Sequence, residues 1–297
     1  MKFKNLAYLL LAFCTTTTFA ACNELDGDNS DFDFGHSAGA AENPYKDGYG
    51  RLPNSIRLAT YNTHRCEGWE TQTNVDRANY NNTAKVISLI DPDVIALQEL
   101  DKFTTWHPHD QLQELADRTG MKPYYCKTID YRGGDYGIGI LSKREPLRTV
   151  SGDLPGTEAR KFFLAEFDDY IFIATHLCHL ETTNRAQSVE IINAYIAANY
   201  ASYTKPIFLA GVLASERMQP RRAEVWVMAP AARAPRMVMH RCSAWMNTAT
   251  PKRIDYIVLY KGNKAACEVL GTAVPSYDEI NVNKVSDHLP VLVDIKK

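Results

Sequence analysis

The chain has 297 residues, a length that suits one large domain. Its formal net charge at pH 7 is −2, so no overall charge attracts it to nucleic acid or to an anionic membrane, and a polyanionic substrate is neither supported nor excluded. The seven cysteines include no C-x-x-C pair and predict neither a zinc site nor a disulfide framework.

Residues 1–22 are predicted to be a targeting segment. Lys2 and Lys4 give a basic start, and the apolar run 6–13 is too short to span a bilayer in the mature protein. Small residues then precede Cys22, which resembles a bacterial lipoprotein signal. We expect an exported protein of the cell envelope, lipid-anchored through Cys22 at the outer membrane or surface. A plain secretory signal cut nearby is the alternative.

Residues 23–50 are predicted to be a flexible acidic tether. Its first part, 23–31, is acidic and poor in apolar residues, so it cannot bury enough surface to order itself. The folded domain is expected at residues 51–297.

Apolar periodicity predicts a series of strands and helices in this domain. Alternating residues over 56–61 indicate a strand, helix-spaced residues over 82–90 indicate a helix, and the apolar run 94–97 indicates a buried strand. Further along, the pattern predicts helices over 109–119 and 184–199, and strands over 136–141, 162–167, 170–174, 206–210, 254–259 and 291–295.

Polar residues recur where these strands end, which is where α/β and sandwich enzymes build their sites. Taken singly, a residue such as Glu99 or His176 is more often an ordinary loop residue than a catalyst. Their joint appearance in one order is far more specific, in the segments Thr60-Tyr61-Asn62, Gln98-Glu99, Ala174-Thr175-His176, Arg253-Ile254-Asp255-Tyr256 and Ser286-Asp287-His288.

The order of these segments resembles the endonuclease/exonuclease/phosphatase superfamily, which has the deoxyribonuclease I-like fold. The resemblance covers residues 56–211 and 253–295; the stretch 91–99 is similar to the family's second strand, and 136–142 to its central strand. It implies an α/β (α+β) protein: a four-layer α/β sandwich in which helices flank two packed mixed sheets.

The resemblance also implies metal-dependent hydrolysis of a phosphoester, in particular a phosphodiester, with Mg²⁺ or Mn²⁺. A hard cation neutralises the charge that develops on phosphate, and Mg²⁺ prefers oxygen ligands. By resemblance, Glu99 is the main carboxylate ligand of the metal, and Asn62 and Asp287 lie nearby.

Four more residues receive catalytic roles from the same resemblance. His288 would serve as a base or electrostatic partner near the attacking water, and Asp255 would orient its imidazole. His176 would donate to a phosphate oxygen. Arg160 would add a charge-assisted contact to phosphate, although an ordinary surface arginine is an equally good interpretation.

Three other histidines, His64, His107 and His109, stand in polar loops. They are interpreted as surface residues rather than ligands.

The resemblance fails directly after Gly211. The family pattern places Asp where Val212 stands, to bind or activate the attacking water, and Asn where Ala214 stands, to hold the phosphate. Valine and alanine have no polar side-chain atoms. Because removing one group of a cooperating set commonly costs orders of magnitude in rate, this chain is expected to be severely impaired.

The same position opens an atypical block, residues 212–246. Its 35 residues contain no Lys, Asp, Ile, Tyr, Phe or Gly, but hold five of the seven methionines and six of the seventeen arginines. Three explanations stay open: a compensated pair of reading-frame shifts, a pseudoenzyme that kept the fold and phosphate binding, and a rebuilt site in which Glu216 or another acid substitutes.

The sequence does not select among lipid, sugar-phosphate and nucleic-acid substrates, because a fold does not choose its substrate. The envelope location and the near-neutral charge weakly favour a lipid or sugar-phosphate phosphodiesterase over a nuclease. The alternative from another class is a non-catalytic phosphate-binding module on the cell envelope. We expect a monomer that meets the membrane through its lipid anchor only.

Overall fold

The structure, a computed structural model, describes residues 44–45, 48–68, 79–213, 237–240 (backbone only), 254–260, 262, 265 and 267–297. All of them belong to the compact unit Glu42–Lys297. The predicted signal with Cys22, the positions Ala214 and Glu216, and most of the atypical block lie outside the described residues. No helix within the described ranges is long and apolar enough to cross a membrane.

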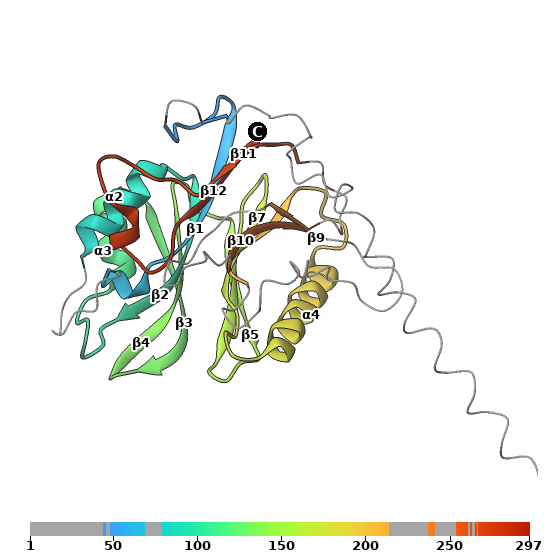
Figure 1. Ribbon diagram of the computed structural model, residues 1–297. Coiled ribbons are helices and arrows are strands. Elements are labelled where there is room, and N and C mark those ends of the chain that lie inside the picture. Colours follow the sequence, from blue (N-terminus) through green and yellow to red (C-terminus); the bar gives the residue numbers. More distant parts are fainter. Residues whose placement is uncertain are drawn as a thin grey trace, which may run out of the picture. The chain divides into compact units, whose positions relative to one another are not determined.

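Two six-stranded sheets form the centre of this unit (Figure 1). The first has the order β11-β12-β1-β2-β4-β3 and the second has the order β5-β6-β7-β8-β10-β9. Both are mixed, because β1 and β2 run parallel, as do β7 and β8, while the other pairs are antiparallel. The strands are β1 Ser55–Asn62, β2 Val94–Lys102, β3 Lys122–Tyr131, β4 Gly134–Ser142, β5 Arg148–Leu154, β6 Arg160–Glu166, β7 Ile171–His176, β8 Ile207–Val212, β9 Met237–His240, β10 Asp255–Tyr260, β11 Val269–Ala273 and β12 Val291–Lys296.

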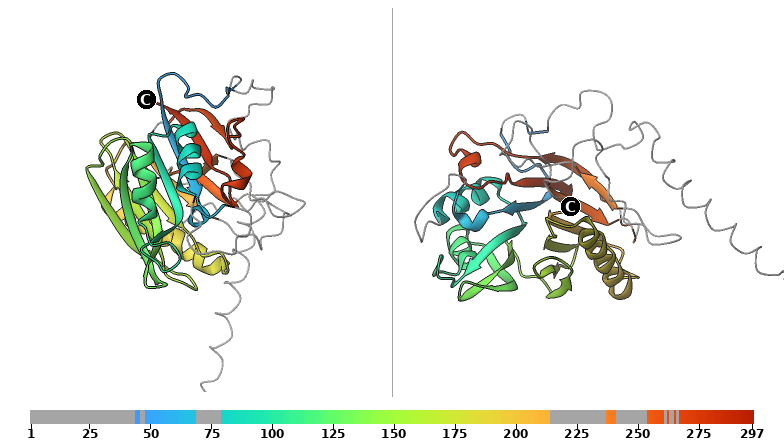
Figure 2. Two further views of the ribbon diagram at one scale, coloured as in Figure 1. Left: turned by 90° about the vertical axis from the view of Figure 1, so that its left-hand side faces the viewer. Right: turned by 60° about the horizontal axis from the view of Figure 1, so that its bottom comes forward.

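Helices lie on the outer faces of the two sheets (Figures 1 and 2). Helices α2 (Tyr80–Ile90) and α3 (Gln111–Thr119) cover the first sheet, and α4 (Thr182–Asn199) covers the second. The side chains of Asn79 and Asp110 accept the backbone N–H three residues later, so each satisfies an orphan donor where its helix begins. Two short 3₁₀ turns, η2 (His64–Cys66) and η3 (Val282–Lys284), complete the described elements.

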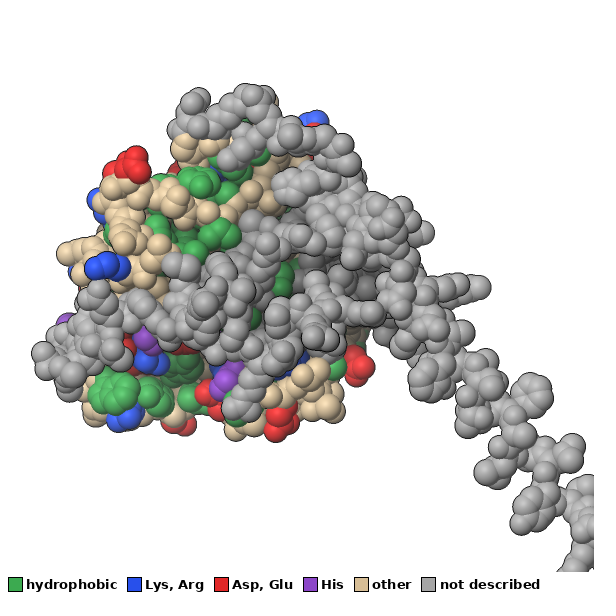
Figure 3. Space-filling model, in the orientation of Figure 1, with side chains coloured by type: hydrophobic (Ala, Val, Ile, Leu, Met, Phe, Trp, Pro, Cys, Tyr) green, Lys and Arg blue, Asp and Glu red, His purple; other side chains and the backbone are tan. Residues whose placement is uncertain are grey.

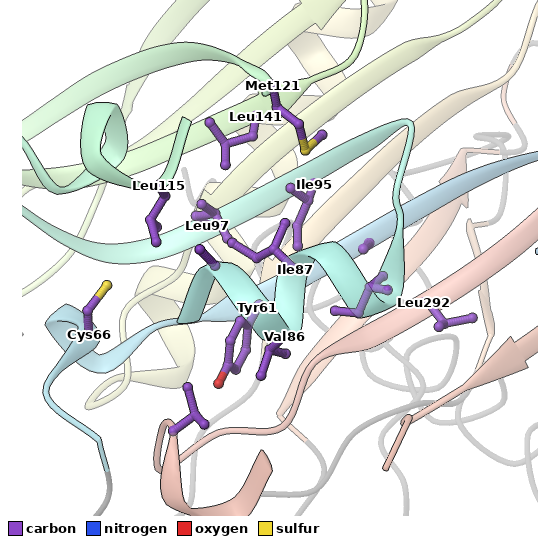
Figure 4. Packing of buried hydrophobic residues seen from close by; sticks show 14 of the residues in the cluster. Tyr61, Cys66, Val86, Ile87, Ile95, Leu97, Leu115, Met121, Leu141 and Leu292 are labelled. Atoms are coloured by element: carbon purple, nitrogen blue, oxygen red, sulfur yellow. The ribbon is translucent and has the colours of Figure 1, made fainter. Parts of the chain in front are cut away.

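Three clusters of buried apolar residues fill the spaces between the helices and the two sheets. Alternate residues of a strand point to opposite faces, so Val94 and Ala96 of β2 enter the layer between the sheets, whereas Ile95 and Leu97 pack against α2 and α3 (Figure 4). A third layer packs the second sheet against α4, with Ile192 and Ile196 among its members. The four-layer α/β sandwich predicted from the sequence is therefore confirmed.

The packing extends upstream of the predicted domain start. Tyr45 is buried, its hydroxyl donates to Asp294 at 3.1 Å, and the Tyr49 carbonyl accepts from Arg57 at 2.7 Å. Arg57 and Asp294 are themselves fully buried and form a bidentate ion pair. Arg57 Nε donates to Asp294 Oδ1 at 2.8 Å, and Nη2 donates to Oδ2 at 2.7 Å. The last part of the segment predicted as a tether thus lies on a buried polar cluster.

Candidate active site

Polar side chains from both sheets meet at one edge of the sandwich. Asn62 ends β1 and is the register partner of Gln98 on the neighbouring strand β2. Because the two strands are parallel, both residues lie at the same edge of the sheet. Gln98 is fully buried and exchanges hydrogen bonds with Thr60 on the neighbouring strand. A Cβ on Gly211 of the second sheet would lie 3.3 Å from the Gln98 amide nitrogen, so the two sheets are in close contact here.

Glu99 is directed by a local break in β2. The pairing of β2 with β4 shifts register between Leu97 and Leu100, and Glu99 takes a φ of 60°, which is uncommon for a residue other than glycine. The Asn62 amide donates to Glu99 Oε1 at 2.8 Å. Burial raises the pKa of Glu99, but the charge of His288 and the hydrogen bond from Asn62 outweigh burial and hold it below its ordinary value. Glu99 is therefore a carboxylate at neutral pH.

His288 and Asp255 form a buried carboxylate–imidazole pair. Asp255 Oδ2 lies 2.7 Å from His288 Nδ1, and the other ring nitrogen lies 3.3 Å from the Asn62 amide. Ser286 fixes the loop, because its hydroxyl donates to the Asn62 carbonyl at 2.7 Å and accepts from the His288 N–H at 3.1 Å. Burial lowers the pKa of His288, but the Asp255 carboxylate outweighs it and raises the pKa to about 9.

His176 and Arg160 approach the same edge from the second sheet. Burial, and then the nearby Arg160 charge, lower the pKa of His176 well below its ordinary value, so the ring is neutral. Its Nδ1 is buried and has no hydrogen-bond partner among the described residues. Arg160 is only 4% exposed, which rules out the surface-arginine interpretation, and its guanidinium lies 3.4 Å from Glu158 and from His179.

Val212 lies between His176 and Asp255 in a row of strand-end residues across β7, β8 and β10. It is the register partner of His176 on β7 and of Asp255 on β10, and it is 3% exposed. The preceding Gly211 has a φ of +138°, and a Cβ there would lie 1.9 Å from the Thr175 carbonyl oxygen. The backbone that delivers position 212 is thus tightly determined, while the side chain delivered is aliphatic.

Several residues near the site were not predicted from the sequence. Burial, and then the Glu99 charge, raise the pKa of Tyr136 well above its ordinary value, and the charges of Arg160 and Arg65 also act on it. The phenol of Tyr136 is therefore close enough to Glu99 and to both arginines for their charges to act on it. The sequence signal that could have pointed to Tyr136 was its position directly before the Gly-Ile-Gly of the predicted central strand.

The interpretation of His107 as a surface residue was wrong. The ring is 1% exposed, and its nitrogens lie 2.6 Å from Asp101 and 3.2 Å from Glu67. His64 is half-buried, with Nδ1 3.9 Å from Asp287 Oδ1, and His109 is exposed. Histidine side chains appear beside acidic and basic ones along the lower part of the described surface in Figure 3.

The oxygen donors at this edge match the chemistry of a hard cation, although they are not arranged around one position. Glu99 supplies an ionised carboxylate, Asn62 an amide, and Asp287 a carboxylate that is half-buried and 3.3 Å from Ser286. Within the described part of the chain, no group of three or more His, Cys, Asp or Glu side chains is placed to hold a metal. The Asn62 oxygen accepts from the His64 N–H at 3.0 Å.

Comparisons with solved structures show the same fold. An endonuclease/exonuclease/phosphatase from Beutenbergia cavernae is 18% identical, with a TM-score of 0.61 over 82% of this chain and 72% of that one. A Bacteroides thetaiotaomicron mannosyl-6-phosphatase is 14% identical, with a TM-score of 0.56 over 81% and 99%. The human Nocturnin catalytic domain with bound sulfate is 15% identical, with a TM-score of 0.57 over 82% and 93%.

A search of curated protein sequences gives no match. The sequence pattern of one protein family, however, matches residues 59–238, which is more than half of the chain and runs from the second half of β1 through β8. By this match, the chain belongs to the endonuclease/exonuclease/phosphatase family.

Proposed function

We propose that this chain is a divalent-metal-dependent phosphoester hydrolase whose turnover is impaired at Val212. The observation that carries the proposal is the position of this residue. Val212 lies between the register partners His176 and Asp255, in a row where the neighbouring strand ends bring polar groups.

The remaining groups of the row suit a phosphate group bound beside a cation. Glu99, Asn62 and Asp287 would hold Mg²⁺ or Mn²⁺, which would withdraw charge from the phosphoryl oxygens. Arg160 donates charge-assisted hydrogen bonds to an oxyanion. The neutral His176 has one ring nitrogen that donates and one that accepts, and the tautomer decides which of the two faces the phosphate.

The Asp255–His288 pair would assist proton transfer in the hydrolysis. With Nδ1 on Asp255, the ring presents Nε2 toward Asn62 and Glu99, where it exchanges a proton with water or with the leaving oxygen. An aliphatic side chain at position 212 provides no acceptor for the attacking water. Impaired turnover with retained phosphate binding is the consequence.

A non-catalytic phosphate-binding protein is the second candidate. The same observation favours it, because Val212 removes a group for turnover and leaves Arg160, His176 and His288 in place. Sugar phosphates are the first ligands to test, since one protein of this fold is a mannosyl-6-phosphatase. Lipid and nucleic-acid phosphoesters are the other two classes.

The deciding experiment uses the full chain with and without Mg²⁺. Isothermal titration with inorganic phosphate measures binding, and hydrolysis of a sugar phosphate, a phospholipid and an oligonucleotide measures turnover. We expect Mg²⁺-dependent binding and slow hydrolysis, both lost in Glu99→Gln. Binding without hydrolysis of any substrate selects the second candidate, and absence of phosphate binding overturns both.

Export and lipid attachment are part of the proposal and rest on residues 1–22 alone. Radiolabelled palmitate should be incorporated by the unmodified chain and not by Cys22→Ala. Labelling that survives this substitution contradicts the anchor. We further propose that the protein is monomeric, which sedimentation of the mature chain tests.

A further inference from the structure

A left-handed turn directly follows β1. His64, Arg65 and Cys66 have φ values of 45°, 53° and 59°, although none of them is glycine. Residues with side chains adopt this conformation singly rather than in runs, because the Cβ crowds the following carbonyl. Such backbone persists only where its surroundings determine it, and it clusters at functional sites.

Neighbouring elements hold the turn in this conformation. The Arg65 carbonyl accepts from the Gln111 side chain at 2.7 Å, and the Cys66 carbonyl accepts from the Asn79 N–H, also at 2.7 Å. The Cys66 side chain is buried in the layer below α2 and α3. The turn is therefore anchored from the first helix layer.

The side chain that the turn presents to the site is Arg65. Its Nη1 lies 3.9 Å from Glu99 Oε2, and its charge acts on Tyr136, as the charge of Arg160 does. The side chain is 21% exposed, so a ligand at this edge can reach it. Arg65, in the turn after β1, and Arg160, at the start of β6 in the second sheet, are thus both close enough to Tyr136 for their charges to act on it.

A chain of alternating charges fixes the guanidinium. Glu67 accepts from Arg65 Nε at 3.2 Å and from Nη2 at 3.4 Å. Glu67 Oε1, which accepts from Nε, also lies 3.2 Å from His107 Nε2, and His107 Nδ1 lies 2.6 Å from the fully buried Asp101. Thr104 donates to Asp101 at 3.0 Å.

This arrangement leaves one end of the guanidinium directed toward Glu99. Glu67 engages Nε and Nη2, and Nη1 is the nitrogen that faces the Glu99 carboxylate. At 3.9 Å the two groups attract each other without forming a hydrogen bond. Nη1 would be free to donate to an oxygen of a phosphate bound beside Glu99.

We propose that Arg65 contacts the phosphate of the ligand, and that Glu67, His107 and Asp101 are positioning residues that fix its orientation. The inference rests on the proposed function, because it requires phosphate at the Glu99 edge. A planar guanidinium held in one orientation suits phosphate better than the flexible point charge of a lysine.

The test is titration of the full chain with inorganic phosphate in the presence of Mg²⁺. Arg65→Gln is expected to weaken phosphate binding about tenfold or more, the loss of one charge-assisted hydrogen bond. Arg65→Lys keeps the charge and is expected to fall between Arg65→Gln and the unmodified chain. Arg118→Gln is the matched control, because this exposed arginine pairs with Glu114 on α3. The Arg118→Gln variant should bind phosphate as tightly as the unmodified chain.

A double-variant cycle tests the positioning residues. Glu67→Gln should weaken phosphate binding several-fold on its own, and should add no further loss to Arg65→Gln, since it acts through that side chain. Thermal unfolding of each variant checks that it is folded. Additive losses from the two substitutions would contradict the positioning role.

The outcomes separate this inference from the proposed function. If the unmodified chain binds no phosphate, both are overturned. If Arg160→Gln weakens binding and Arg65→Gln does not, only the role of Arg65 is overturned. If Arg65→Gln does not fold, Arg65→Lys decides, and an affinity equal to that of the unmodified chain overturns the proposal.

Discussion

Asp255 and Val212 are direct register partners across β10 and β8. On its other side, Asp255 holds the His288 ring at 2.7 Å. The aliphatic side chain therefore borders a carboxylate–imidazole pair that is itself intact. Because the register of β8 continues through Val212 on both sides, the defect lies in a side chain rather than in the backbone.

Restoring the missing polar groups should therefore restore turnover. We expect Val212→Asp combined with Ala214→Asn to raise the Mg²⁺-dependent hydrolysis rate by roughly two orders of magnitude or more, the scale of losing one member of a catalytic set. Initial rates on a generic phosphoester measure this. Val212→Asn with Ala214→Asn is the control, because it matches the shape of aspartate without its charge. A repaired chain no faster than the unmodified one would show that position 212 does not limit the rate.

The sequence predicted the interior of both sheets and did not predict their edges. The strands β3, β5, β9 and β11 are the four edge strands, and none of them was predicted. Edge strands are solvated, so their residues do not alternate cleanly; β5, for example, buries only Leu154. The central strands read as apolar runs because both of their faces are buried, as in β2 and β8.

The same distinction applies to the candidate site. Glu99 and His288 were identified because their segments stand beside predicted strands in an order that resembles the family pattern. Arg65 and His107 were missed, because their positions depend on a left-handed turn and on one buried partner, Asp101. Hydrophobic periodicity carries no signal for either, and a polar loop looks solvated until its partner is known.

The buried pair Arg57–Asp294 should dominate stability at the start of the domain. Both side chains are fully buried, so removing one charge leaves the other uncompensated. We expect Asp294→Asn to lower the free energy of unfolding by about 3–5 kcal/mol, measured by urea denaturation. Glu268→Gln is the control, because its ion pair with Lys296 is exposed and should contribute less than about 1 kcal/mol. Equal effects of the two substitutions would contradict this assignment.

Gly211 should tolerate no side chain. A Cβ would lie 1.9 Å from the Thr175 carbonyl oxygen, and the φ of +138° strains any other residue. We expect Gly211→Ala to destabilise the fold by about 2–5 kcal/mol, measured by urea denaturation. In Gly120→Ala, the control, φ is also positive but no atom lies within 4 Å, so the cost should be about 1 kcal/mol. Similar costs at both positions would mean that the close approach to Thr175 relaxes.

Stability should fall in the alkaline range because of His107. Burial lowers the pKa of this ring, but its bonds to Asp101 and Glu67 outweigh burial and raise the pKa from 6.5 to about 9. Folding therefore favours the protonated ring, and the stabilisation is complete below pH 6.5 and lost as pH rises through 9. The shift corresponds to about 3 kcal/mol at most.

Urea denaturation of the unmodified chain and of His107→Asn at pH 6, 7.5 and 9 checks this prediction. The unmodified chain should lose stability steadily over that range, whereas the variant should be less stable at pH 6 and should lose less on going to pH 9. His288, whose pKa is also raised to about 9, supplies the slope that remains in the variant. Parallel curves for the two proteins would mean that His107 is not held protonated by Asp101 and Glu67.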